Sequence, residues 1–243
     1  MDELAIRRDL AAAYRLIALD GMDDGISTHV SARLSDDRFL LNAFGLRFEE
    51  VREDNLVTVS GDGEVLDDPT GLGINPAGFT IHSALHDARP EVVCVLHTHT
   101  VAGVALSCLE EGLLPLNQWA LQFHDRLAYH DYEGIALDLD ERERLAADLG
   151  PHRAMILRQH GLLTCGRSVG EAFLVMRDLE RSCQAQLAAQ ATGRPLRMAS
   201  SAMAEHVARQ YEAWADSPAG LGRAWQAECR RLADHTPADL QTL

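Results

Sequence analysis

The sequence contains no lysine, because all 22 of its basic residues are arginine. A lysine amine is the group that forms a Schiff base with a carbonyl substrate, anchors pyridoxal phosphate, or contacts nucleotide phosphates from a P-loop. Each of these mechanisms is therefore excluded for this chain. If the protein acts on a carbonyl compound, a group other than lysine must polarise the carbonyl.

Basic residues are also outnumbered by acidic ones, which gives the 243 residues a net charge of −15 and a pI near 5.0. Nucleic-acid-binding proteins display clustered basic residues, so nucleic acid is not expected as a partner. No apolar run reaches the roughly 18 residues of a membrane span, and charges interrupt the N-terminal segment where a signal peptide would be apolar. We expect a cytoplasmic protein with no membrane partner.

Cysteine is scarce, odd in number and scattered. The five cysteines are Cys94, Cys108, Cys165, Cys183 and Cys229. Most stand in apolar surroundings, which favours reduced thiols in a core over a disulfide framework. Hydrophobic residues make up 47% of the chain and are sufficient for such a core.

Strand-like runs occupy the middle of the chain, and helical patterns flank them. The runs are THVSARL, RFLLNA, LVTVS, EVLDD, EVVCVLHTHT and AMILRQHG. The turn GDG predicts a hairpin between LVTVS and EVLDD. Helical spacing is found in AGFTIHSALHDARP, in ERERLAADLG with Asp138 or Asp140 as its cap, and in VGEAFLVMRDLERSCQAQLAAQA. This order predicts one layered α/β domain.

Two histidines, His97 and His99, end the apolar run VVCVLHTHT. Alternate residues of a strand point to the same face, so the two imidazoles project together and suit one metal ion. His160 is the best third ligand, because it too follows an apolar run and precedes a glycine. Three imidazoles suit zinc, iron, manganese, cobalt or nickel and leave positions for substrate oxygens. The alternative is that the pair is a chance feature of a strand end.

Two further histidines, His82 and His86, lie four residues apart, a spacing that also permits metal binding. The intervening residues lack the glutamate of an HExxH motif. Packing or hydrogen bonding is therefore the favoured interpretation of this pair.

Four blocks together resemble the class II aldolase/adducin family, specifically its adducin-like bacterial branch. The blocks are INPAGFTIHSALHDARPEVVCVLHTHT, LLPLNQWAL, AYHDYEGIALD and MILRQHGLLTCG. The resemblance implies an α/β fold of three layers, α/β/α, with a central, mainly antiparallel sheet. It also implies a homotetramer with sites at subunit interfaces, and a divalent ion, zinc before iron, manganese, cobalt or nickel, held by His97, His99 and His160.

The resemblance extends from about Leu10 to Ala191 and sets the expected domain organisation. Residues 1–191 are predicted to form the class II aldolase/adducin-like domain. Residues 192–243 are predicted to form a helical C-terminal extension that packs on the same domain or on a neighbouring subunit.

Departures from the family pattern change the expected substrate. Where the sugar-phosphate aldolases of this family place a glutamate before the HxH strand, this chain has Gly78. Their hydroxyl-bearing phosphate loops are replaced by NAFG at 42–45 and NPA at 75–77. A sugar phosphate is therefore not the expected substrate.

The remaining residues predict a divalent-metal-dependent lyase. It would act by retro-aldol cleavage or decarboxylation on a small oxo acid, hydroxy acid or hydroxy ketone that the metal chelates. The segment FHDRLAYHDYEG contains His124, His130 and Tyr132, and we expect His130 or Tyr132 to be the general acid or base. The alternative for this segment is a subunit contact.

Three other residues are predicted to bind substrate. His29 falls where the family binds substrate from a glycine-rich loop, with Arg33 nearby, although Arg33 also suits an ordinary surface ion pair. Tyr211 is included by analogy with aldolases that use a C-terminal tyrosine.

Two other functions remain open from the sequence. The same three histidines suit a non-haem iron oxygenase, and some relatives resemble such enzymes. Adducin head domains of cytoskeletal proteins share these blocks and serve in assembly, so a non-catalytic assembly domain is the second alternative.

Overall fold

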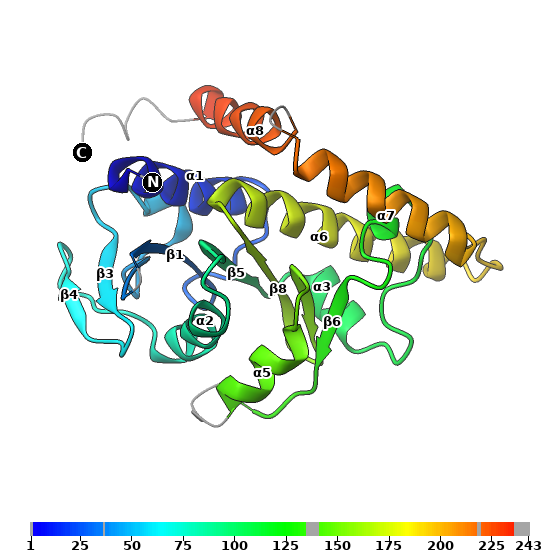
Figure 1. Ribbon diagram of the computed structural model, residues 1–243, viewed down its shortest axis with the longest axis horizontal. Coiled ribbons are helices and arrows are strands. Elements are labelled where there is room, and N and C mark those ends of the chain that lie inside the picture. Colours follow the sequence, from blue (N-terminus) through cyan, green and yellow to red (C-terminus); the bar gives the residue numbers. More distant parts are fainter. Residues whose placement is uncertain (1, 36, 135–140, 218–219, 236–243) are drawn as a thin grey trace.

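Within the residues that the structure describes, eight strands form one sheet in the order β4-β3-β2-β1-β5-β8-β7-β6. The computed structural model describes residues 2–35, 37–134, 141–217 and 220–235 (Figure 1). The strands are β1 His29–Ser35, β2 Arg38–Leu41, β3 Val57–Ser60, β4 Val65–Asp67, β5 Cys94–Thr98, β6 Leu127–His130, β7 Ala154–Leu157 and β8 Gly161–Gly166. All neighbouring strands are antiparallel except β6 and β7, which are parallel. The expected central, mainly antiparallel sheet is therefore confirmed.

Helices cover both faces of the sheet and complete the three predicted layers. They are α1 Glu3–Leu19, α2 Pro76–Ala88, α3 Val101–Ser107, α4 Gln118–Leu121, α5 Glu141–Leu149, α6 Val169–Ala191, α7 Ser201–Ala215 and α8 Leu221–His235, with a 3-10 turn, η1, at Phe48–Glu50. Helices α1, α3 and α6 lie on one face, and α2 and α5 lie on the other (Figure 1). In the described part of the chain, none of the helices combines the length and apolar character that crossing a bilayer requires.

Burial of β5 on both faces explains its continuous apolar sequence. Cys94 and Leu96 belong to the core formed with α1 and α6, whereas Val95 belongs to the core formed with α2 and α5. A strand covered on both sides needs apolar residues at successive positions rather than at alternate ones. His97 shares the face of Val95, so its imidazole lies on the side of α2 and α5.

Several local predictions are confirmed. The GDG turn joins the antiparallel strands β3 and β4, and the longest predicted helix is α6. Ser168 caps α6, because its hydroxyl oxygen accepts a hydrogen bond from the backbone N–H of Glu171 at 3.1 Å. The proposed caps Asp138 and Asp140 lie outside the described residues.

The C-terminal helices pack on the helical layer of the same chain. The indole of Trp225 in α8 lies 5.6 Å from the ring of Phe173, and its Nε1 donates to Asp9 at 2.9 Å. A Cβ at Gly170 would lie 2.5 Å from the Trp225 ring, so α6 and α8 approach closely because this residue is glycine. Packing of the extension on a neighbouring subunit stays a prediction.

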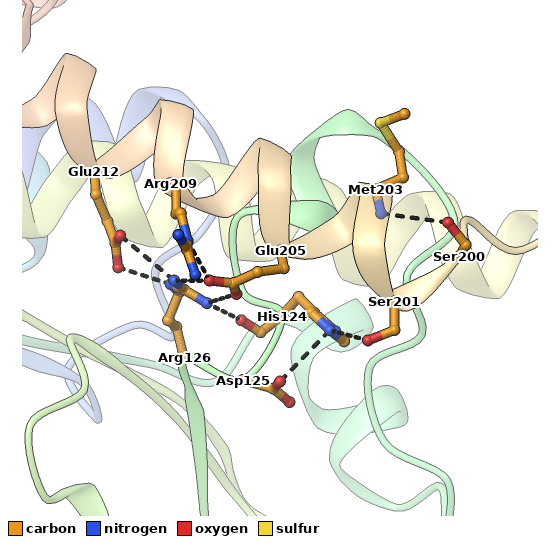
Figure 2. A network of polar contacts seen from close by, with 9 residues as sticks. All are labelled: His124, Asp125, Arg126, Ser200, Ser201, Met203, Glu205, Arg209 and Glu212. Carbon is orange, nitrogen blue, oxygen red and sulfur yellow. Dashed lines mark hydrogen bonds and ion pairs between the residues drawn. The ribbon is translucent and has the colours of Figure 1, made fainter.

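Ion pairs attach α7 to the start of β6. Arg126 donates to Glu205 at 2.6 Å and to Glu212 at 2.7 Å, and Arg209 also pairs with Glu205 (Figure 2). Hydrogen bonds from these two arginines lower the pKa of Glu205 to about 2. His124 contacts the first residue of α7 in the same network (Figure 2), so its imidazole takes part in fixing the extension.

A close backbone contact joins β8 to β5 beside the HxH pair. A Cβ at Gly161 would lie 2.3 Å from the carbonyl oxygen of Thr98 and 3.3 Å from the ring of His99. Atoms do not approach so closely, so any side chain at 161 would push the two strands apart. The glycine next to His160 is therefore required by packing.

We expect Gly161→Ala to lower the free energy of unfolding by about 3 kcal/mol, because the added methyl group meets backbone atoms that cannot rotate away. Chemical denaturation monitored by circular dichroism measures the change. Gly222→Ala is the matched control: a Cβ there meets nothing within 4 Å, and alanine favours helix α8 by up to about 1 kcal/mol. Equal stability of the Gly161→Ala and Gly222→Ala variants would contradict the packing argument.

Candidate functional site

Antiparallel pairing brings the HxH segment to one end of the sheet. His97 is the partner of His29 on β1 and of Leu163 on β8. His99 follows the last residue of β5 and is 22% exposed in its side chain, whereas His97 is buried. The two imidazoles therefore lie at the boundary between the core and the surface.

His160 reaches the same place from the tight turn between β7 and β8. Gln159 in this turn has a φ of 57°, in the left-handed region that a residue with a side chain adopts only at a cost of about 1–2 kcal/mol. The backbone N–H of Gln159 donates to the carbonyl of Ser107 at 3.3 Å, and that of Arg158 donates to the carbonyl of His130 at 2.8 Å. These bonds hold the turn that carries His160.

The three predicted ligands come together. Nε2 of His99 lies 2.8 Å from Nε2 of His97 and 2.9 Å from Nε2 of His160. The described residues contain this one group of metal-ligating side chains whose ligand atoms all lie within 4.8 Å of one another.

The other ring nitrogens determine which atoms are available to a metal. Nδ1 of His97 lies 2.9 Å from the carbonyl oxygen of Leu162, and Nδ1 of His99 lies 3.0 Å from Oδ2 of Asp24. Carbonyl and carboxylate oxygens only accept, so both Nδ1 atoms carry a proton, and a neutral ring then has its lone pair on Nε2. The Nε2 atoms are therefore the ones that a shared metal ion would contact.

Burial keeps His97 and His160 neutral. Burial is the main cause that lowers the pKa of His97 well below its ordinary value and that of His160 to about 4. Neutral imidazoles oriented through Nδ1 by an acceptor are the usual ligands of zinc and similar ions. The residues present therefore fit a divalent metal ion.

The histidine pair of α2 has the hydrogen-bonding role expected for it. Both His82 Nδ1 and His86 Nε2 contact the hydroxyl of Ser31, at 2.7 and 2.8 Å. Nε2 of His82 also lies 2.8 Å from Nδ1 of His29, whose ring centroid is 5.4 Å from that of His97. His29 therefore adjoins the three-histidine cluster.

The two predicted acid–base residues line one small pocket with His160. The ring of Tyr132 lies 6.1 Å from that of His160, and Tyr132 is 51% exposed. His130 is 4% exposed, and its Nδ1 donates to Asp148 at 2.7 Å. Its buried Nε2 makes no hydrogen bond within the described residues and lies 3.5 Å from Glu141.

Two predicted substrate residues lie away from the cluster. Arg33 lies four residues beyond His29 on β1, where its guanidinium donates to the carbonyls of His86 and of Val92. Tyr211 lies on α7 and lines a separate cavity of about 810 Å³ between α4, α6 and α7. Their role in substrate binding stays a prediction.

Three residues that orient the site were not predicted. Asp24, Asp148 and Ser31 each hold an imidazole, yet none stands in a motif. Asp24 lies in a loop 75 residues before His99, so only the folded structure reveals the pair. One feature of the sequence could have indicated Ser31: alternate residues of a strand point to the same face, so Ser31 lies on the face of His29.

The protein belongs to the family described as Class II Aldolase and Adducin N-terminal domain, which matches residues 8–187. A Pseudomonas aeruginosa protein, named only provisionally as a class 2 aldolase, is 47% identical over 246 residues, covering 97% of this chain and 92% of its own length. Alpha-adducin of Mus musculus is 43% identical over 189 residues, covering 76% of this chain and 26% of its own.

Solved structures of the family confirm the fold. An aldolase II superfamily protein from Pseudomonas syringae superposes with a TM-score of 0.92 at 51% identity, covering 96% of this chain and 94% of its own. L-fuculose 1-phosphate aldolase from Glaciozyma antarctica superposes with a TM-score of 0.83 at 29% identity, covering 96% and 91%.

The buried imidazoles predict that stability falls in acid. Burial lowers the pKa of His86 to about 3, so the unfolded chain takes up a proton below pH 6.5 that the folded chain refuses until about pH 3. Because of His86, the free energy of unfolding should therefore fall by about 1.4 kcal/mol for each pH unit of acidification in this window. Urea unfolding at pH 7, 6 and 5 measures the slope.

We expect His86→Gln to reduce this slope by about 1.4 kcal/mol per pH unit, which corresponds to one proton, because glutamine keeps an amide group there but does not titrate. His206→Gln, which replaces an exposed histidine of α7, is the control and should leave the slope unchanged. If His86→Gln kept the wild-type slope, His86 would not be held neutral by burial.

Proposed function

We propose that this chain is a divalent-metal-dependent lyase, with zinc as the metal, that breaks a carbon–carbon bond in a small oxo acid, hydroxy acid or hydroxy ketone. The observation that carries the proposal is the convergence of the Nε2 atoms of His97, His99 and His160, with the first two rings oriented by Leu162 and Asp24. Membership of the class II aldolase family supports lyase chemistry.

His97, His99 and His160 would hold the metal ion. A bound divalent ion supplies a Lewis-acid charge next to the substrate oxygens, which is the charge that a lysine would provide in a Schiff-base aldolase. Because the chain has no lysine, carbonyl polarisation rests on this site.

Tyr132 is the preferred proton-transfer residue. Its ring adjoins His160 and is half exposed, so its hydroxyl is accessible to a substrate that lies on the cluster. His130 is buried, and Asp148 orients its ring through Nδ1, which leaves Nε2 able to accept a proton inside the pocket. In a retro-aldol reaction, one such group takes the hydroxyl proton and a second protonates the carbanion.

A sugar phosphate is not the proposed substrate, although one structural neighbour is an L-fuculose 1-phosphate aldolase. The segments at 42–45 and 75–77 lack most of the hydroxyl groups with which the resembling aldolases bind phosphate. Gly78 likewise offers no carboxylate. We infer a smaller substrate without a phosphate group, and a homotetramer as the working assembly in the cytoplasm.

The likeness to alpha-adducin supports a second candidate function. In that alternative, the domain assembles with partners and performs no reaction. Metal content is the observation that separates it from a lyase.

The first test of the proposed function is metal content. Protein purified without a histidine tag or chelator should contain about one zinc per chain by elemental mass spectrometry, because three converging imidazoles suit zinc. His160→Ala should lose the metal, and Asp24→Ala should weaken zinc affinity about tenfold by removing the acceptor of His99 Nδ1. His206→Ala, at an exposed position, is the matched control.

Different metals would lead to different conclusions. Iron in place of zinc, with iron-dependent oxygen uptake, would favour the oxygenase. A folded wild-type protein that binds no divalent metal even after incubation with zinc would overturn the lyase and favour the assembly domain.

The second test concerns Tyr132. On a substrate identified by screening oxo and hydroxy acids, Tyr132→Phe should lower kcat about 100-fold, because it removes only the transferable proton. Metal content and oligomeric mass should be unchanged. Near-normal turnover together with a changed oligomeric mass would instead assign Tyr132 to a subunit contact.

A further inference from the structure

The cavity between α4, α6 and α7 lies at the opposite end of strands β6 and β7 from the three-histidine cluster. The two strands are parallel, so both begin at one end and both finish at the other. His130, the last residue of β6, lies in the small pocket with His160. Arg126 and Arg153, each placed just before its strand begins, line the cavity of about 810 Å³. The cavity is therefore separate from the cluster.

Most of the residues around this cavity are apolar or aromatic. Leu174 comes from α6, Val207 and Trp214 come from α7, and Trp119 comes from α4. Trp119 and Trp214 are 40% and 44% exposed, so much of their apolar surface is uncovered. An apolar group placed in the cavity would remove this surface from water, which is the main source of affinity in small-molecule sites.

Two of the three arginines in the lining are occupied by the protein itself. Arg126 donates from all three guanidinium nitrogens to two glutamates of α7 (Figure 2). Arg177 donates from its three nitrogens to Asp178 and Glu228. Every nitrogen of these two groups has a carboxylate partner, so neither arginine needs an anion from outside.

Arg153 differs from the other two arginines. Its Nη1 donates to Glu171 at 2.6 Å, whereas its Nε and Nη2 make no hydrogen bond within the residues that the structure describes. The side chain is 34% exposed. The Nε–H and Nη2–H bonds lie parallel along one edge of a guanidinium group and match the two oxygens of a carboxylate. This edge of Arg153 can therefore bind a planar anion.

The carboxylate of Glu171 does not make this end of the cavity acidic. Glu171 is 2% exposed, and besides Arg153 it binds Arg167, which donates from its backbone N–H at 2.7 Å and from Nε at 3.3 Å. Arg167 also pairs with Asp216 at 2.7 Å. Two guanidinium groups thus share one buried carboxylate, and its charge is compensated before any ligand binds.

His152 lines the cavity as well, and its imidazole makes no hydrogen bond within the described part of the chain. Burial lowers the pKa of His152, and the charges of Arg126 and Arg89 lower it further. Both charged groups among these causes are cations. The potential at the ring is therefore positive, which favours an anion next to it.

We propose that this cavity binds a small organic carboxylate with an apolar or aromatic body. The carboxylate accepts from Nε and Nη2 of Arg153, and the body packs against Leu174, Val207 and Trp214. The forked donor selects a planar anion, while the apolar walls disfavour small hydrophilic acids. This inference goes beyond the proposed lyase and does not depend on it, because His97, His99 and His160 do not line the cavity.

The first experiment compares three ligands by calorimetric titration of the full chain. Phenylacetate should bind about tenfold more tightly than phenylacetamide, because the amide has no charge for Arg153. It should also bind about tenfold more tightly than acetate, which lacks the aromatic body. If phenylacetate showed no binding at millimolar concentration, or no advantage over phenylacetamide, the inference would be wrong.

Variants at Arg153 locate the carboxylate. Arg153→Gln should abolish the preference for phenylacetate over phenylacetamide, whereas Arg153→Lys, which keeps the charge without the fork, should retain part of it. Arg167→Gln is the matched control, because it also removes a guanidinium group from Glu171 but at a position outside the cavity lining. Wild-type preference in Arg153→Gln would overturn the inference.

A second pair of variants locates the body of the ligand. Val207→Trp should fill the cavity and weaken phenylacetate binding at least about tenfold. His206→Trp, at the exposed neighbouring position of α7, should bind as the wild type does. Saturation with phenylacetate should also raise the pKa of His152 in NMR titrations, because an adjacent anion stabilises the imidazolium. An unchanged pKa of His152 together with full binding in Val207→Trp would place the ligand elsewhere.

His160→Ala separates this inference from the proposed function. The variant should lose the proposed metal and still bind phenylacetate with wild-type affinity. Loss of binding in a folded His160→Ala protein would place the carboxylate on the metal, which overturns the inference and leaves the lyase intact. Binding through Arg153 in a wild-type protein that holds no zinc would support the cavity while the lyase fails.

Discussion

The antiparallel pairing of β5 with β1 and β8 is the constraint on which the rest of the structure depends. It sets His97 opposite His29 and brings the glycine after His160 against the backbone of Thr98. Three segments spread over some 130 residues thereby place their imidazoles on one face. A shift of one residue in either register would turn His97 into the opposite core, because successive strand residues point to opposite faces.

The chemistry of the basic residues follows from their being arginine throughout. A guanidinium group keeps its proton at any physiological pH and therefore cannot act as a general base or nucleophile. In the structure, Arg126 joins the start of β6 to α7, and Arg231 joins α8 to the end of α1, each through a carboxylate. Histidine and tyrosine, two of the residue types that can transfer protons, gather between β5, α2 and the segment after β6.

Local patterns were sufficient to predict parts of the molecule and insufficient for others. The HxH pair and helix α6 depend on periodicities of two and 3.6 residues, so both were predictable from the sequence. The contact of His160 with His99 was expected from the analogy between two strand ends and from the resemblance to the family, because neighbouring strands are not apparent from periodicity. The parallel pairing of β6 with β7, and the orientation of His99 by Asp24, join segments that lie apart in the sequence and carry no pattern that predicts the contact.

The contacts of His82 and His86 with the hydroxyl of Ser31 have a consequence for β1. If β1 slid by one residue along α2, Ser31 would turn to the opposite face of the sheet, and two buried imidazoles would lose their hydrogen-bond partner. Helix α2 therefore helps to fix the register of β1, and with it the position of His29 next to His97.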